Sequence, residues 1–229
     1  GLRVALFEAT DFGFGTTWRS TKLIHGGLRY LEHGDVRLVR ESLRERSWLL
    51  QTRPYLVTPQ RLFLPMLPWT RRPGWQLRIG LAAYDLLALY RGVPKHRALR
   101  REKLRELAPY LPGSAGGGFS FYDARIHAPE RLALELALEA RRLGAVIANH
   151  TRVVSVTSDG KRVTGVVVEA EGEAHAIPTR AVINAAGPWV DAVARLAEPE
   201  ERGILGVTRG THLVLEPEVL PTQAAVLST

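Results

Sequence analysis

The segment "STKLIHGGLRYLE", residues 20–32, combines residue types that could hold an anion and a planar group. Ser20 and Thr21 offer hydroxyl and backbone donors at a predicted helix start, where an anion such as a pyrophosphate can bind. Gly26 and Gly27 need a reason, because glycine inside a helix costs up to about 1 kcal/mol relative to alanine. One reason is a planar ring lying on the backbone, and another is a tight crossing of two helices. The continuous run of Ser-Thr-Lys, His-Gly-Gly and Leu-Arg-Tyr favours a binding site.

Two further places could approach a nucleotide. Glu8 ends a predicted strand, and in a nucleotide-binding α/β unit such an acid accepts hydrogen bonds from ribose hydroxyls. A strand-end glutamate is also common as a solvated carboxylate. The segment "NAAGPWVD", residues 184–191, places small residues and Pro188 between a predicted strand and a helix. A cofactor could approach the main chain closely there, although an ordinary helix start looks the same.

The remaining candidates are weaker by themselves. The strand "TRVVSV", residues 151–156, could pair its backbone with an adenine edge, as could any half-buried strand. His212, in "TRGTHLVLE", follows a glycine turn. A lone histidine is more often structural than catalytic, so His212 becomes a catalytic candidate only if Arg29 and Tyr30 face it across a pocket.

The elements that must position these residues alternate between strands and helices. Asp35 is a predicted N-cap, Pro129 a predicted first helical residue, and Asp159-Gly160 a predicted hairpin turn. This order predicts an α/β fold with a partly parallel sheet. We expect helices over 23–32, 35–51, 74–90, 99–111 and 129–143, and strands over 3–8, 61–68, 119–122, 145–149, 152–157, 163–169, 180–187 and 210–216.

Composition narrows the function classes. The 229 residues fit one large domain or two small ones, and 45% of them are hydrophobic, so a packed core is expected. The sequence has no cysteine, which excludes disulfides, thiolate zinc sites and cysteine nucleophiles. No apolar run approaches the roughly 20 residues of a membrane-spanning helix. The net charge of +8 fits an arginine-rich genome bias, an anionic substrate, a lipid surface or a nucleic acid.

One basic segment has the pattern of a lipid-interface helix. Over residues 69–103, Trp69, Trp75 and Tyr90 bracket an apolar helix with arginines and lysines around it. Aromatic residues at the edge of an apolar face, with cations beside them, suit a helix lying on a membrane. A core helix with solvated arginines would give the same pattern, so both interpretations stay open.

The segment "TTWRSTKLIHGGLRYLEHGDVRLVRESLRER" resembles the signature of the flavin-dependent glycerol-3-phosphate dehydrogenases, within the glycine/D-amino-acid oxidase-like flavoproteins. "RIGLAAYDLLA", "INAAGPWVD" and "RGTHLVL" continue the resemblance in the family's order. It implies an incomplete FAD-binding Rossmann-like (three-layer) domain, over 1–60 and 119–190, and the start of an antiparallel substrate-domain sheet, over 61–118 and 203–229. The family's N-terminal glycine-rich turn and C-terminal part are absent, so we expect a fragment that is inactive alone. Trp18-Arg19 also departs from the family's small residues.

The resemblance also implies roles for individual residues. Glu8 would bind the adenosine ribose, Val153 would lie by the adenine, and Ala186 and Gly187 would lie near the pyrophosphate. Arg29 and Tyr30 would approach the substrate, with His212 as the proton acceptor. No metal is implied. The other FAD-contacting residues would be Ser20, Thr21, Lys22, Leu23, His25, Gly26, Gly27 and Trp189.

The implied activity is oxidation of sn-glycerol 3-phosphate to dihydroxyacetone phosphate, with hydride passing to FAD and electrons to a membrane quinone. The implied location is the cytoplasm, at an anionic membrane surface on the inner face of the cytoplasmic membrane, and a homodimer is one arrangement left open. A glycerol-3-phosphate oxidase and an amine or amino-acid oxidase of the same group are the enzymatic alternatives. A basic RNA- or protein-binding module is the alternative from another class. Dispersed arginines and the lack of an RNA-binding motif argue against nucleic acid.

Overall fold

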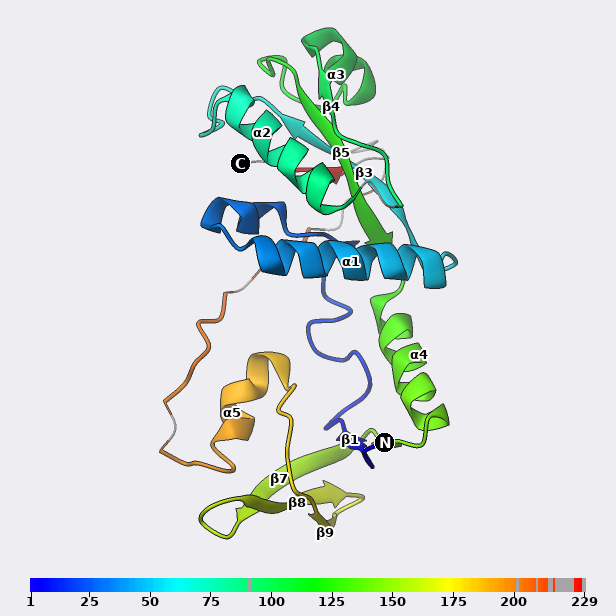
Figure 1. Cartoon of the computed structure of the whole chain (residues 1–229), viewed down its shortest axis with the longest axis vertical. Helices are drawn as coiled ribbons and strands as arrows, with labels where there is room; N and C mark the ends of the chain where they lie inside the picture. The colour runs from blue at the N-terminus through cyan, green and yellow to red at the C-terminus, as the bar shows by residue number, and fades with distance from the viewer. Residues whose placement is uncertain (90–91, 201, 209, 214–215, 217–224, 228–229) are drawn as a thin grey trace. The chain divides into compact units, whose positions relative to one another are not determined.

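A computed structural model describes residues 1–89, 92–200, 202–208, 210–213, 216 and 225–227 (Figure 1). The chain divides into two compact units. The first unit contains Gly1–Thr21 and Ala128–Thr211, and the second contains Lys22–His127 and His212–Thr229. Helices occur in both units together with parallel and antiparallel strands, which confirms the predicted α/β class.

In the first unit, β1 (Ala5–Phe7) pairs in parallel with β6 (Val146–Ala148). Helix α4 (Pro129–Arg142) precedes β6, and Pro129 begins it as predicted. A three-stranded antiparallel sheet follows, made of β7 (Thr151–Ser158), β8 (Val163–Ala170) and β9 (Glu173–Pro178). The predicted turn between β7 and β8 is confirmed, because the Asp159 carboxylate accepts hydrogen bonds from the amides of Lys161 and Arg162. Strand β9 was not predicted, because its residues are mostly exposed and Ile177 is its one large aliphatic side chain.

The strand predicted over 180–187 is wrong. The described residues 181–186 belong to no sheet, and Ile183 is 91% exposed. An apolar run favours a strand only where another strand offers backbone partners, and the described part of the chain offers none here. The 3-10 helix η2 (Gly187–Trp189) and the short helix α5 (Val190–Ala194) follow.

The second unit is built on a five-stranded sheet. Strand β3 (Val57–Pro65) pairs antiparallel with β5 (Gly118–Ile126) over its whole length. The short strands β2 (Leu23–Ile24) and β4 (Arg97–Leu99) also pair with β5, and β10 (Ala225–Val226) pairs with β3.

Alternate residues of β3 face two different cores. Leu62 and Leu64 pack into a cluster with residues of helices α1 (Val36–Thr52) and α2 (Gly74–Leu87), whereas Phe63 packs with residues that include Leu104 of α3 (Arg101–Leu107). Figure 1 shows α1 and α2 together beside the sheet. The Asp35 carboxylate accepts from the Leu38 amide, which confirms the predicted N-cap of α1.

Other predictions change in the second unit. The helix predicted over 23–32 is wrong, because Leu23 and Ile24 pair with β5 and Gly27 has a left-handed φ of 75°. Only the 3-10 helix η1 (Leu28–His33) remains of it. Residues 210–213 form no strand, and Val214 and Leu215 of that prediction lie outside the described residues.

The observed units also divide the chain differently from the predicted ranges. Residues 22–60 and 119–127 group with 61–118, because β3 pairs with β5 across both predicted boundaries. The assignment of the units to FAD binding and substrate binding stays a prediction.

Candidate active site

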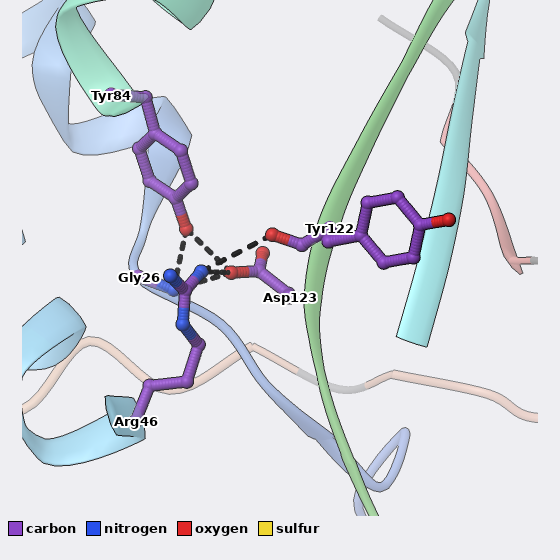
Figure 2. A network of polar contacts seen from close by, with 5 residues as sticks. All are labelled: Gly26, Arg46, Tyr84, Tyr122 and Asp123. Carbon is purple, nitrogen blue, oxygen red and sulfur yellow. Dashed lines mark hydrogen bonds and ion pairs between the residues drawn. The ribbon is translucent and has the colours of Figure 1, made fainter. Parts of the chain in front are cut away.

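A buried polar network holds the backbone at Gly26 (Figure 2). The Gly26 amide donates to the Tyr84 hydroxyl oxygen at 2.7 Å and, at 3.3 Å, to Oδ1 of Asp123. The Tyr84 hydroxyl donates to the same Asp123 oxygen at 2.7 Å. Arg46 Nη1 donates to Asp123 Oδ1 and to the Tyr122 carbonyl at 3.2 Å. The network therefore ties α1, α2 and β5 to the segment between β2 and η1.

Burial fixes the protonation of Tyr84 in this network. The Arg46 and Asp123 side chains are 0% and 4% exposed, so they form a buried ion pair. Burial, and then the negative charge of Asp123, raise the pKa of the Tyr84 phenol above its ordinary value. Tyr84 therefore keeps its proton and donates it to Asp123, while its oxygen accepts from Gly26.

Contacts within the protein explain why positions 26 and 27 are glycines. A Cβ at Gly26 would collide with the Leu43 side chain and with the Tyr84 hydroxyl. Gly27 combines its left-handed φ with a position where a Cβ would collide with the Tyr30 ring. Neither glycine lies in a helix interior, so no bound ring is needed to explain them. Their contact with a flavin stays a prediction.

The candidates of the second unit, except His212, lie in one short segment. Leu23 belongs to β2, His25 is exposed, and Arg29 and Tyr30 lie in η1 with exposed side chains. Lys22 precedes them with a left-handed φ of 57°. The segment thus brings the predicted flavin contacts and the predicted substrate contacts together through its sequence and its fold.

An open groove of about 420 Å³ runs beside this segment. It is lined by Leu23, Ile24 and His25 and by Glu41, Ser42 and Glu45 of α1. Ionised glutamates would repel a phosphate, so this groove does not fit the substrate phosphate. Arg29 is not among its lining residues.

His212 is described as an exposed residue outside any helix or strand. No hydrogen bond within the described part of the chain joins it to Arg29 or Tyr30. The grouping of these three residues as a catalytic set therefore stays a prediction.

In the first unit, Glu8 directly follows β1, and Val153 lies in β7. The Thr151 amide donates to the Glu8 carbonyl at 2.9 Å, which joins the end of β1 to the start of β7. The Glu8 carboxylate accepts from the Thr10 amide at 2.9 Å and the Thr10 hydroxyl at 3.1 Å, both through Oε1. Those two bonds leave Oε2 for a ribose hydroxyl, and this fits the predicted role.

The turn at η2 also fits a cofactor. Gly187 has a left-handed φ of 54°, and a Cβ there would meet nothing within 4 Å. Open space above a backbone turn is what close approach of a pyrophosphate requires. The Ala186 amide is held by the Asn184 side chain at 3.2 Å, and a Cβ at Gly15 would contact the ring of Trp189 at 3.0 Å. The loop after β1 and the turn at η2 are therefore neighbours.

Ser20 and Thr21 do not begin a helix. Both lie in irregular structure, and β2 follows them. The helix N-terminus predicted to seat an anion is therefore absent at this place. A cofactor could meet these residues only through their hydroxyls and through loop amides.

Sequence reasoning missed the residues of the buried network. Arg46 follows Val39 and Leu43 at helical spacing on the buried face of α1, so an arginine stands in an apolar position. An arginine in an apolar helix position could have indicated a buried ion pair. Tyr84 and Asp123 gave no comparable signal. Within the described residues, no three His, Asp or Glu side chains group as they would around a metal ion.

A glutamate directly after a parallel strand, an open glycine turn and an α/β fold are features that occur in nucleotide-binding oxidoreductases. Residues 1–228 match the model of the family described as FAD dependent oxidoreductase, and the chain belongs to this family. The predicted family, fold and cofactor, FAD, are thereby confirmed.

The names of individual relatives are more specific than the family description, because they include a substrate. The chain is 39% identical over 232 residues to a glycerol-3-phosphate dehydrogenase of Synechocystis sp., covering 95% of this chain and 42% of that protein. It is 37% identical over 220 residues to a D-erythritol 1-phosphate dehydrogenase of Brucella abortus, covering 94% and 43%. A solved glycerol-3-phosphate dehydrogenase of Bacillus halodurans, complexed with FAD, is 29% identical with a TM-score of 0.60, over 85% of this chain and 31% of that one. The chain thus spans less than half the length of these relatives.

Proposed function

We propose that the protein to which this chain belongs oxidises sn-glycerol 3-phosphate to dihydroxyacetone phosphate with FAD, and passes the electrons to a quinone. The observation that carries this proposal is the segment from β2 to η1. It joins the predicted flavin contacts to Arg29 and Tyr30 within a few residues and is anchored by a buried network. The relative of 39% identity named glycerol-3-phosphate dehydrogenase supports the choice of substrate.

Arg29 would hold the substrate phosphate. Its guanidinium is exposed on η1, and its planar fork can pair with two phosphate oxygens at once. Tyr30, next to it and 42% exposed, would contact the carbon chain. His212 would accept the proton of the C2 hydroxyl group as a general base.

Each residue predicted to contact FAD would have its own role. Glu8 would bind the ribose through Oε2, Val153 would lie by the adenine, and the open turn at Ala186 and Gly187 would receive the pyrophosphate. Trp189 would lie beside this turn. The flavin would be lined by residues 20–27. When bound, FAD supplies the acceptor for the hydride that leaves C2.

The surface of α2 supports contact with a membrane that holds the quinone. Trp75 and Ile79 are 63% and 61% exposed, and Leu86, on the same helix face, is 61% exposed. Arg71 and Arg78 are exposed beside them, whereas Arg72 pairs with Glu32. An apolar face with flanking cations suits an anionic lipid surface on the cytoplasmic side. Tyr90, part of the predicted pattern, lies outside the described residues.

A helix of this kind would lie on the membrane. No helix of the described residues is both long and apolar enough to cross one.

A second substrate has one specific observation in its favour. The Brucella abortus relative, at 37% identity, is named a D-erythritol 1-phosphate dehydrogenase. At this level of similarity, the substrate of the present protein could be a polyol phosphate with either carbon-chain length. Arg29 would serve either phosphate equally.

The test uses the full-length protein, purified with its flavin. Turnover would be measured with sn-glycerol 3-phosphate, D-erythritol 1-phosphate and glycerol, each with a soluble quinone and with oxygen as acceptor. The proposal expects the highest kcat/KM with sn-glycerol 3-phosphate and the quinone. A higher value with D-erythritol 1-phosphate would replace the substrate, and faster turnover with oxygen would make the protein an oxidase. Equal turnover of glycerol would remove the phosphate role of Arg29.

A further inference from the structure

We propose that Tyr84, Asp123 and Arg46 form a positioning network that fixes the orientation of the His25–Gly26 peptide, and through it the segment that binds FAD and substrate. The inference rests on the proposed function, because that function gives the segment its ligands. None of the three residues is placed in contact with substrate. They act through the backbone at Gly26.

The hydrogen bonds of the network have a fixed direction. The Gly26 amide has one proton, which it donates chiefly to Tyr84 at 2.7 Å. Tyr84 has one proton, which goes to Asp123, and Arg46 supplies a further donor to the same carboxylate oxygen. Since the buried phenol does not ionise, the order of donors cannot reverse. The plane of the His25–Gly26 peptide is therefore set by groups on α2, β5 and α1.

The orientation of this peptide affects the position of the residues proposed to contact the substrate. The described chain contains no cis peptide bond, so the His25 carbonyl points away from the network while the Gly26 amide points into it. Gly27 then turns the chain through its left-handed φ, and its carbonyl accepts the Tyr30 amide at 2.8 Å. A change of the Gly26 peptide would thus move the start of η1, which carries Arg29.

Stability alone does not account for the buried charge. Arg46 is fully buried, yet its Nε and Nη2 have no hydrogen-bond partner within the described part of the chain. Well-packed apolar residues in place of a buried ion pair often give equal or greater stability. The unfavourable burial of the Arg46 guanidinium therefore indicates that the Asp123 carboxylate is needed to hold Tyr84 and Gly26 in position.

The test compares Tyr84→Phe with Leu81→Val and Leu81→Ala in the full-length protein. Phenylalanine keeps the ring, which packs edge-to-face on Phe121 with centroids 6.3 Å apart, and removes only the hydroxyl. Leu81 is fully buried on the same helix and in the same core, but it is not part of the hydrogen-bond network at Gly26. The two Leu81 variants bracket the loss of stability, so the comparison can be made at equal melting temperature.

Three readouts separate positioning from packing. Amide hydrogen exchange over residues 25–30 should be about tenfold faster in Tyr84→Phe, as expected for loss of one hydrogen bond. The longer bond from Gly26 to Asp123 remains and limits the effect. The FAD dissociation constant should rise by a similar factor, about tenfold, with a change in the visible spectrum of the bound flavin. For substrate, kcat/KM should fall further than in either Leu81 variant.

Equal changes in Tyr84→Phe and in the Leu81 variants, at equal melting temperature, would overturn the inference. The unmutated protein tests the proposed function separately. If it binds no FAD and oxidises no polyol phosphate, the proposed function and the catalytic meaning of the network fail together. If it is active and only the Tyr84 comparison fails, the network is ordinary core.

Discussion

The Arg46–Asp123 ion pair offers a quantitative test of the energetics around Gly26. Arg46→Met removes the cation and leaves the Asp123 carboxylate 4% exposed without its charged partner. Breaking a buried pair by removing one partner costs about 3–5 kcal/mol, because the remaining charge stays buried. Near-complete burial of the remaining Asp123 carboxylate argues for the upper half of that range.

The double variant Arg46→Met/Asp123→Leu should recover much of this loss. Both charges are gone, and so are the two guanidinium nitrogens that lack partners in the described part of the chain. We expect it to be about 2 kcal/mol more stable than the single variant. A cost remains because the Tyr84 hydroxyl loses its acceptor, whereas the Gly26 amide keeps its bond to the Tyr84 oxygen.

The assay is urea unfolding of the full-length protein, followed for all variants under the same conditions. Arg37→Met is the matched control, since Arg37 lies on the same helix and its pair with Glu41 is exposed, so it should cost less than about 1 kcal/mol. A loss below about 1 kcal/mol in Arg46→Met, or a double variant no more stable than the single one, would refute the reasoning.

Three other variants test separate points. Gly27→Val should prevent folding of the segment by strain at its left-handed φ, whereas Gly27→Asn should retain more FAD, which flavin content measures. If both variants fold and lose the same amount of flavin, direct contact between residue 27 and the flavin ring, and not backbone strain, determines flavin retention. Arg29→Ala should lower kcat/KM for the phosphorylated substrate by a factor that corresponds to about 2 kcal/mol, and should leave kcat/KM for glycerol unchanged. An equal loss with glycerol would contradict the phosphate role of Arg29. Trp75→Ser combined with Arg71→Glu should reduce sedimentation with anionic vesicles at low salt, and unchanged sedimentation would leave α2 as an ordinary surface.

Local signals in the sequence predicted several elements correctly. Asp35 caps α1 as expected, Pro129 begins α4, and Asp159-Gly160 forms the turn of a hairpin. Each of these depends on bonds within a few residues of the chain. The strand β1 was also predicted, and Glu8 directly follows it.

Predictions failed where distant partners decide the conformation. Leu23 and Ile24 have a helical pattern with their neighbours, but pairing with Arg125 and Ala124 on β5 makes them a strand. The reverse happened at Ile183, whose apolar neighbours predicted a strand that has no sheet partner in the described chain. Pairing partners a hundred residues away leave no trace in a local pattern.

The candidate site shows the same division. The motif around Gly26 led to a predicted site in this segment, but the structural cause of its glycines lies in contacts with Leu43, Tyr84 and Tyr30. Sequence spacing cannot show that a tyrosine from α2 and an aspartate from β5 meet one amide. The binding role of the segment stays a prediction from the sequence, and its structural support became visible only in the fold.

The most direct measurement is anaerobic reduction of the bound flavin in the full-length protein. Addition of sn-glycerol 3-phosphate should bleach the visible absorbance of oxidised FAD, and a quinone added afterwards should restore it. Glycerol at the same concentration should leave the spectrum unchanged. A protein that retains FAD but keeps its oxidised spectrum with sn-glycerol 3-phosphate would contradict the proposed function.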